Sequence, residues 1–387
     1  MNALTDPWVT RRIEALADYL TTSGVLDPRT SDGACWLRAL SEVPRHLFVP
    51  ALAWAQPMDD RPESVINKRD APEPWWNAVY SNTAIITQRG DGYTDVVDKR
   101  AAATSSTSSP HVVMEFLRLL DLDHHHRVLE IGTGTGWTAG LLSWRLGDDQ
   151  VTSIDVDSAI LLTAAENLKA AGFTPTLLEK DGALGAPGRA PFDRVHVTCG
   201  VRDIPYAWVE QTRPGGSIVL PWMPLPGGWG HQLRLDVLDD GSAVGTFHGG
   251  CGFMMLRSQR RREWPPYEGE SIESTTRLDP REIWRALDNG FGLALAASAS
   301  HVVITSAGWE DGEGWSGWVM RLRDLQGSGW AHVSVRPGED TEVTQSPGRQ
   351  IWATLETAYM EWLRAGRPDR SAYRMIVTPG GQRVWLT

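Results

Sequence analysis

The stretch VLEIGTGTGW, residues 128–137, decides the fold. An apolar run ends here in glycines at alternate positions, Gly132, Gly134 and Gly136, and TAGLLSWRLG follows with the composition of a helix. Glycines at a strand-to-helix turn allow a tight turn and the close approach of a ligand to the backbone. The dinucleotide fingerprint requires Gly or Ala where this chain has Trp137, so that match fails.

Strand and helix signals alternate on both sides of this turn, over about residues 110–235. The segments QVTSIDVD, TPTLLEKDG, FDRVHVTCG and SIVLPW indicate strands, and an Ala-rich helix is expected between the first two of them, over about residues 158–171. Alternation at this spacing predicts a parallel, doubly wound α/β sheet.

The chain has 387 residues, which is too long for one average domain. Apolar residues at helical spacing predict an N-terminal helical segment over residues 1–75, with loops expected over 56–76 and 87–109. The α/β core is assigned to residues 76–240. Gly-rich turns, short strands, an amphipathic helix from Ile351 and a terminal hairpin indicate an α+β domain over residues 241–387.

Composition excludes several classes of protein. The 37 basic and 48 acidic residues give a net charge of −11, which argues against a nucleic-acid binder. The three cysteines are far apart, which fits a reducing compartment and offers no metal motif. Neither a signal peptide nor a run of eighteen apolar residues is evident, so a cytoplasmic protein without a membrane span is expected.

The spacing E-x-G-x-G-x-G resembles motif I of the class I methyltransferases, which bind S-adenosylmethionine. The resemblance implies that an acid ending the next strand holds the ribose and that a later turn meets the adenine. Carboxylates at strand ends are placed to accept such hydrogen bonds. The alternative is a generic α/β turn with capping acids. The implied cofactor-binding residues are Glu130, Gly132, Thr133, Gly134, Gly136, Asp155, Val156, Asp181 and Gly182.

A narrower resemblance is carried by VPRHLFVP (residues 43–50), AVYSNTAI (78–85) and SSPHVV (108–113), and by DGALG, PFDRVHV and RPGGSIVLP, which follow in the same order. These segments resemble the protein-L-isoaspartate O-methyltransferases. The resemblance implies that Ser108 orients the substrate carboxylate, with Thr107 and Ser106 assisting. The alternative for the Ser/Thr run is a flexible linker.

The chemistry suits such a site. A carboxylate is ionised at neutral pH, since its pKa is ordinarily about 3.9, so it needs no general base to attack a sulfonium methyl group. The enzyme must still align the carboxylate with the methyl group and remove water from the carboxylate. No metal is expected.

Two departures narrow the resemblance further. The segment before Ser108 is longer and rich in Ser and Thr, and residues 241–387 are expected to be absent from the ordinary repair enzyme. These features resemble the methyltransferases found with ribosomal peptides of the graspetide and lanthipeptide types. That resemblance implies a precursor-peptide partner, in which a methylated aspartate cyclises to aspartimide and can hydrolyse to isoaspartate. General isoaspartyl repair and a non-catalytic peptide-binding scaffold with a vestigial cofactor pocket remain as alternatives.

Other candidates have mostly structural interpretations. Arg45 and His46 are expected to pin the N-terminal helices, and the consecutive histidines 124–126 are expected to be exposed and not to gather around a metal. The basic cluster Arg257, Arg260, Arg261 and Arg262 is expected to be a solvated face, with a clamp for an acidic or macrocyclic peptide as the alternative. Most tryptophans are expected in the core or at a domain interface, and the candidates for a peptide groove are Trp309, Trp315 and Trp318.

Overall fold

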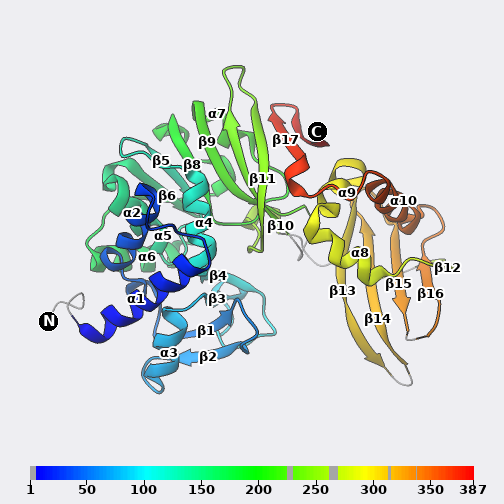
Figure 1. Ribbon diagram of the computed structural model, residues 1–387, viewed down its shortest axis with the longest axis horizontal. Helices are drawn as coiled ribbons and strands as arrows, with labels where there is room; N and C mark the ends of the chain where they lie inside the picture. The colour runs from blue at the N-terminus through cyan, green and yellow to red at the C-terminus, as the bar shows by residue number, and fades with distance from the viewer. Residues whose placement is uncertain (1–5, 225–229, 261–268, 313–314, 337) are drawn as a thin grey trace. The chain divides into compact units, whose positions relative to one another are not determined.

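The computed structural model describes residues 6–224, 230–260, 269–312, 315–336 and 338–387. Two compact units make up the chain (Figure 1). Unit 1 comprises Met1–Cys199 and Ala207–Val219, and unit 2 comprises Gly200–Tyr206 and Leu220–Thr387. The N-terminal segment therefore belongs to the same unit as the glycine turn.

Unit 1 opens with two helices, as predicted. In α1 (Pro7–Thr22) the side chain of Asp6 caps the first turn, and the buried face consists of Val9, Ile13, Leu16 and Leu20. Thr30 caps α2 (Ser31–Glu42) in the same way. Capping side chains satisfy backbone N–H groups that have no partner within the helix. The short 3-10 turn η2 (Arg45–Phe48) follows.

A small antiparallel sheet comes next, in the order β2-β1-β3-β4. The expectation of loops over residues 56–76 and 87–109 is only partly confirmed: residues 90–102 form a loop, but strands and a helix occupy much of the rest. The polar Ser/Thr run is itself an edge strand, because threonine suits a half-buried pleated surface and Ile85 pairs with Thr107 across the ladder. The elements are β1 (Leu52–Pro57), β2 (Ser64–Asn67), α3 (Pro72–Val79), β3 (Thr83–Arg89), η3 (Gly90–Gly92) and β4 (Ala103–Thr107).

The core of unit 1 is a parallel sheet in the order β9-β8-β5-β6-β7. Helices alternate with these strands along the chain, so the predicted parallel α/β architecture is confirmed. The elements are α4 (Pro110–Leu120), β5 (Val128–Ile131), α5 (Trp137–Leu146), η4 (Asp148–Gln150), β6 (Val151–Asp155), α6 (Ser158–Ala171), β7 (Thr176–Glu179), η5 (Gly182–Leu184), η6 (Pro187–Arg189), β8 (Phe192–Val197), α7 (Tyr206–Glu210) and β9 (Thr212–Trp222).

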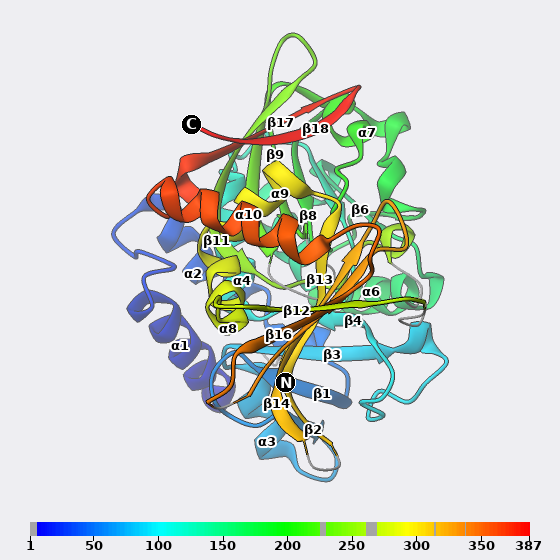
Figure 2. The same ribbon diagram turned by 90° about the vertical axis from the view of Figure 1, so that its right-hand side faces the viewer.

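Unit 2 contains antiparallel strands in the order β10-β11-β17-β18. It also contains a five-stranded antiparallel sheet in the order β12-β16-β15-β14-β13, against which three helices pack (Figure 2). The elements are β10 (Gly230–Val237), β11 (Ala243–Cys251), η7 (Arg257–Gln259), β12 (Ile272–Thr276), α8 (Pro280–Ala286), η8 (Leu287–Asn289), α9 (Phe291–Ala299), β13 (Val302–Gly312), β14 (Trp315–Asp324), β15 (Trp330–Val335), β16 (Thr341–Gln345), α10 (Ile351–Arg364), η9 (Arg370–Ala372), β17 (Tyr373–Thr378) and β18 (Gly381–Leu386).

This arrangement confirms the predicted α+β character of the C-terminal part. The amphipathic helix is α10, whose apolar face enters a core with the strands, and the terminal hairpin is β17–β18. Among the described residues, every helix is too short or too polar to span a bilayer.

The buried His46 should make the stability of unit 1 depend on pH. Burial, with a smaller contribution from Lys68, lowers the pKa of His46 from 6.5 to about 4. Because the folded pKa is the lower one, the unfolded chain takes up this proton first as the pH falls. The stabilising contribution is therefore complete above pH 6.5 and is lost between pH 6.5 and about 4. One pKa unit corresponds to about 1.4 kcal/mol, so the loss approaches about 3 kcal/mol.

Urea unfolding at pH 7 and at pH 4.5 measures this effect. We expect His46→Gln to remove part of the fall in the free energy of unfolding that the unaltered protein shows between these pH values. Burial also lowers the pKa of His231, to about 3, but that residue is present in both proteins and cancels in the difference. Equal pH dependence in the two proteins would contradict the prediction.

Candidate cofactor and substrate site

The glycine turn has the backbone conformation that its sequence demands. Gly132, Gly134 and Gly136 have φ values of 97°, 53° and 91°, in the left-handed region that favours glycine. A Cβ atom on Gly132 would lie 2.4 Å from Oγ1 of Thr198, and one on Gly134 would lie 3.2 Å from the carbonyl oxygen of Ser106. The turn therefore packs closely between the end of β8 and β4, and side chains at these two positions are excluded.

Asp155 ends β6 beside this turn. One of its carboxylate oxygens accepts a hydrogen bond from the backbone N–H of Gly134 at 3.0 Å, and the other accepts from the N–H of Asp157 at 3.1 Å. Val156 is 40% exposed next to it. The backbone N–H of Lys180 donates to the carbonyl of Asp155 at 2.9 Å, so Asp181 begins its turn close by. The structure thus brings the predicted ribose acid and the glycine turn into direct contact.

Asp181 and Gly182 have local roles in the turn that follows β7. The Asp181 carboxylate accepts from the N–H of Ala183 at 3.0 Å and caps η5, while the Gly182 carbonyl accepts from the indole N–H of Trp208 at 2.8 Å. These bonds fix the turn predicted to meet the adenine. The assignment of the turn to adenine remains a prediction.

Glu130 lies beneath the turn and is fully buried. One carboxylate oxygen accepts from the Ser153 hydroxyl at 2.5 Å, and the Ser153 oxygen lies 2.7 Å from Oγ1 of Thr133 in the turn. The other oxygen has no hydrogen-bond partner and lies 3.8 Å from Nδ1 of His196, which has none either. Glu130 therefore supports the turn from below, and sequence reasoning missed His196 as its neighbour.

Arg45 has a larger role than pinning helices. Its buried guanidinium donates to the carbonyls of Val79 at 2.7 Å, Thr83 at 2.8 Å, Thr107 at 3.2 Å and Ser108 at 2.9 Å. It also lies 5.1 Å from the ring centroid of the tryptophan that begins α5, immediately after the glycine turn. One buried cation thus ties the predicted substrate serine to the start of the cofactor helix.

The three predicted substrate residues have different surroundings. Ser108 is half-buried between β4 and α4, with its carbonyl held by Arg45. Thr107 is buried and its hydroxyl lies 2.9 Å from that of Thr135 in the glycine turn, so this side chain joins the two segments. Ser106 is half-buried and places its carbonyl against Gly134. The linker alternative is wrong, because residues 103–107 form β4.

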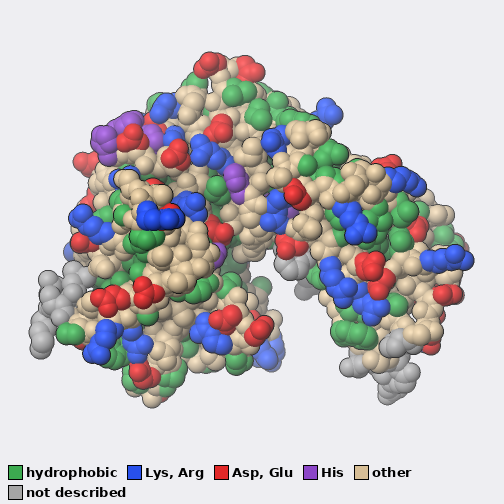
Figure 3. All heavy atoms as spheres, in the orientation of Figure 1, with side chains coloured by type: hydrophobic (Ala, Val, Ile, Leu, Met, Phe, Trp, Pro, Cys, Tyr) green, Lys and Arg blue, Asp and Glu red, His purple; other side chains and the backbone are tan. Residues whose placement is uncertain are grey.

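The histidine run differs from its expectation. His124 and His125 are exposed as predicted, and their ligand atoms lie within 4.8 Å of each other and of a carboxylate oxygen of Asp123. The three histidines do not all meet at this point, because His126 is outside the group. His126 is buried and accepts from the backbone N–H of Asp123. Histidine side chains accordingly gather on one surface (Figure 3). All three potential ligands are solvent-exposed.

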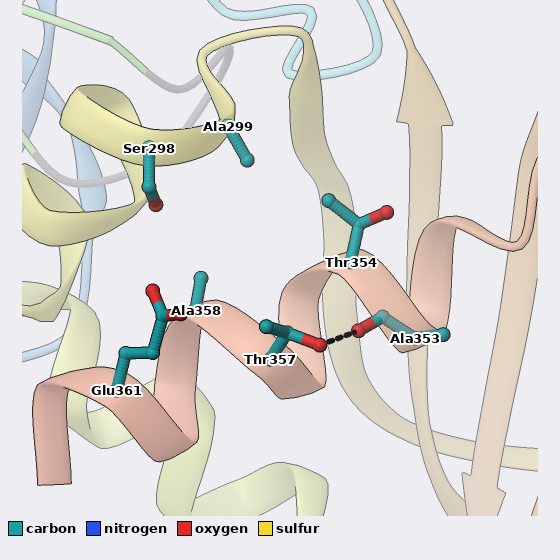
Figure 4. Close-up of a pocket in the computed structure, with 7 residues that line it drawn as sticks. All are labelled: Ser298, Ala299, Ala353, Thr354, Thr357, Ala358 and Glu361. Carbon is teal, nitrogen blue, oxygen red and sulfur yellow. Dashed lines mark hydrogen bonds between the residues drawn. The ribbon is translucent and has the colours of Figure 1, made fainter. Parts of the chain in front are cut away.

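Of the unit 2 candidates for peptide recognition, those whose side chains the structure describes have different surroundings. Trp309 is 60% exposed, whereas Trp318 is buried in the core, and the side chain of Trp315 lies outside the described residues. Arg261 and Arg262 also lie outside them. A pocket of about 370 Å³ between α9 and α10 is lined mostly by small side chains (Figure 4). None of its residues belongs to the predicted site.

The parallel sheet, the glycine turn and the acid at the end of the next strand define a class I S-adenosylmethionine-dependent methyltransferase. A family model described as protein-L-isoaspartate(D-aspartate) O-methyltransferase matches residues 71–260. The chain belongs to this family of carboxyl methyltransferases, which use S-adenosylmethionine as cofactor.

Three relatives named protein-L-isoaspartate O-methyltransferase illustrate the similarity. The protein from Methanosarcina mazei is 32% identical over 48% of this chain and 62% of its own length. The protein from Pyrococcus horikoshii is 36% identical over 40% of this chain and 70% of its own length. The protein from Syntrophus aciditrophicus is 30% identical over 56% of this chain and 79% of its own length. This chain thus spans less than two thirds of the length of the Methanosarcina mazei protein.

A solved structure of the same name extends the likeness in fold beyond the core. It aligns with 97% of this chain and 99% of its own, with a TM-score of 0.53 and 19% identity. A protein of this name therefore has an extended chain of comparable fold. Residues 241–387, which are expected to be absent from the ordinary repair enzyme, therefore have a counterpart in fold in at least one protein of this name.

The residues present fit the cofactor of the family. The turn carries three glycines with positive φ, so no side chain covers its backbone at these positions, and Asp155 supplies a half-buried carboxylate directly beside them. Glu130 adds a buried carboxylate oxygen without a partner. Buried polar atoms without partners are costly and mark places where a donor is expected.

Proposed function

We propose that this protein methylates a side-chain carboxylate of an aspartate-derived residue in a peptide. The observation that supports this proposal is that β4 packs against the glycine turn and ends one residue before Ser108, whose carbonyl is held by Arg45. A carboxylate that accepts a hydrogen bond from the Ser108 hydroxyl would lie beside the turn that binds the cofactor.

The chemistry follows from this placement. The cofactor supplies a methyl group on a sulfonium sulfur. A bond forms between a carboxylate oxygen and the methyl carbon while the carbon–sulfur bond breaks, giving a methyl ester and S-adenosylhomocysteine. Because the carboxylate is already ionised, the protein has no proton to remove. Ser108 would orient the nucleophile, and Arg45 and Thr107 would hold the backbone that carries Ser108.

A matched pair of synthetic peptides tests the general activity. One contains an L-isoaspartyl residue and the other an aspartyl residue in the same sequence. Incubation with S-adenosylmethionine should add about 14 Da to the isoaspartyl peptide and produce an equal amount of S-adenosylhomocysteine. Family membership supports this substrate class. If cofactor binds but neither peptide nor any precursor peptide is methylated, the non-catalytic scaffold is the better interpretation.

A narrower substrate is proposed on one further observation. The segment between β3 and β4 forms a loop held by its own backbone hydrogen bonds, and its length is the first of the two departures from the family pattern. We infer a ribosomal precursor peptide, methylated at an aspartate and cyclised to aspartimide with loss of methanol. The pre-cyclised precursor encoded beside this gene should end about 18 Da below its starting mass. An unchanged precursor, with turnover of arbitrary isoaspartyl peptides, would favour general repair.

Ser108→Ala should slow methyl transfer without weakening cofactor binding. Removing one hydrogen-bond donor from a reacting centre commonly costs about 100-fold in turnover. We expect a kcat reduced about 10- to 100-fold and an unchanged Kd for S-adenosylhomocysteine, measured by calorimetry. Ser64→Ala is the matched control, because Ser64 is exposed on β2 of the same small sheet. Full turnover by Ser108→Ala would show that the Ser108 hydroxyl does not orient the substrate.

A further inference from the structure

The loop between β3 and β4, residues 90–102, has a built shape. Arg89 is 6% exposed, and its guanidinium donates to the carbonyls of Val96 and Ala101, each at 2.9 Å. The same guanidinium lies 5.3 Å from the ring centroid of Trp54. One buried cation thus holds two points of the loop. A loop that is already ordered gives up less conformational entropy when it binds a partner.

The base of this loop lies beside the cofactor acid. The side-chain amide of Gln88 donates to Asp157 at 3.2 Å, two residues beyond Asp155, and accepts from the Thr104 hydroxyl at 2.7 Å. The Thr104 oxygen in turn accepts from the backbone N–H of Asp91 at 3.1 Å. The turn that starts the loop is therefore linked to the cofactor end of β6, while β4 runs from the loop to Ser108.

The outer part of the loop presents an aromatic side chain and a slight negative charge. Tyr93 is 95% exposed, although it follows directly on the anchored turn η3. The loop carries the carboxylates of Asp91, Asp95 and Asp98 against the cations Lys99 and Arg100, a net charge of −1. An exposed aromatic side chain on an ordered loop is available to contact a bound peptide, and its ring face attracts cations.

We propose that residues 90–102 form a docking arm for the peptide chain beside the methylated residue, with Tyr93 as the main contact. The arm selects peptides that carry Lys or Arg near the target. This proposal rests on the proposed function and names how its substrate is chosen. In this proposal the loop determines which peptide is bound, and cofactor binding does not depend on it.

Peptide length and charge test the arm. Three isoaspartyl probes are needed: one of about four residues, one of about twelve with lysines flanking the target, and the same long peptide with glutamates instead. The unaltered protein should bind the lysine peptide best, measured by fluorescence anisotropy in the presence of S-adenosylhomocysteine. Tyr93→Ala should raise the Kd and KM for the long lysine peptide about five- to tenfold and leave the short peptide unchanged.

Three controls make the result specific. Tyr93→Phe keeps the ring and should retain most of the affinity, while Leu162→Ala removes a 69% exposed side chain from α6 and should change nothing. The Kd for S-adenosylhomocysteine should stay constant in all variants. Equal effects of Tyr93→Ala on short and long peptides, or no preference for the lysine peptide, would overturn the arm. The proposed function itself would fail in a different way: the unaltered protein would methylate none of the peptides.

Discussion

Replacing Arg45 with methionine should cost about 3–5 kcal/mol of the free energy of unfolding and abolish methyl transfer. Burial lowers the pKa of Arg45 to about 9, which still leaves it charged at neutral pH. Methionine fills a similar length but donates no hydrogen bond, so four buried carbonyls lose a donor at once. Removing one partner from a buried charged interaction typically costs this much.

Activity should fail even where folding survives. Two of the four carbonyls belong to Thr107 and Ser108, so their loss releases the backbone that presents the substrate serine. Arg45→Lys should be intermediate, since one ammonium group has three donors and a shorter reach. Urea unfolding and turnover at low temperature measure the two effects.

An exposed arginine provides the matched control. Arg29 forms an ion pair with Asp27 on the surface, so Arg29→Met should leave stability and turnover nearly unchanged. If Arg45→Met lost less than about 1 kcal/mol of stability and kept its turnover, the guanidinium would not be the anchor that its hydrogen bonds indicate.

The local features of the site could be predicted from sequence because each depends on a few consecutive residues. Gly132, Gly134 and Gly136 allow a tight turn that other residues would resist, and the structure has this turn, with positive φ at all three positions. An acid at the end of the next parallel strand must reach the same sheet edge, as Asp155 does. Both predictions follow from strand geometry and steric limits alone.

The partners of these residues could not be predicted in the same way. Arg45 belongs to the segment VPRHLFVP, but the four carbonyls that it contacts come from α3, β3, β4 and the residue that follows β4. His196 looked like an ordinary residue of a buried strand, and only the paired ladder of β5 and β8 places it opposite Glu130. Such contacts join residues far apart in sequence.

Composition was misleading where polar residues form regular structure. The Ser/Thr run was open to interpretation as a linker, yet its side chains alternate between Thr107, turned toward the glycine turn, and the half-buried Ser106 and Ser108. Period-two alternation is the strand signal, and serine and threonine obscured it because neither is strongly apolar. Trp318 shows the opposite case, since this candidate for a peptide groove packs in the core of unit 2.

Asp155→Ala should weaken cofactor binding about 100-fold while the fold persists. The carboxylate would accept hydrogen bonds from the ribose hydroxyls, and a hydrogen bond to a charged group contributes about 1.5–3 kcal/mol. It also accepts from the N–H groups of Gly134 and Asp157, so its removal loosens the glycine turn. Asp155→Asn should be milder, because one amide oxygen remains as an acceptor. Calorimetry with S-adenosylhomocysteine measures both.

Glu179→Ala is the control matched to this prediction. Glu179 pairs with Asp155 in the register of β6 and β7 and is also an acid that ends its strand, but it is exposed and makes no contact with the turn in the described structure. Its replacement should leave the Kd unchanged. Equal losses in the two variants would mean that general negative charge at this sheet edge, rather than the placement of Asp155, binds the cofactor. Because the reaction needs no general base, the same variants should lose rate only in proportion to cofactor occupancy.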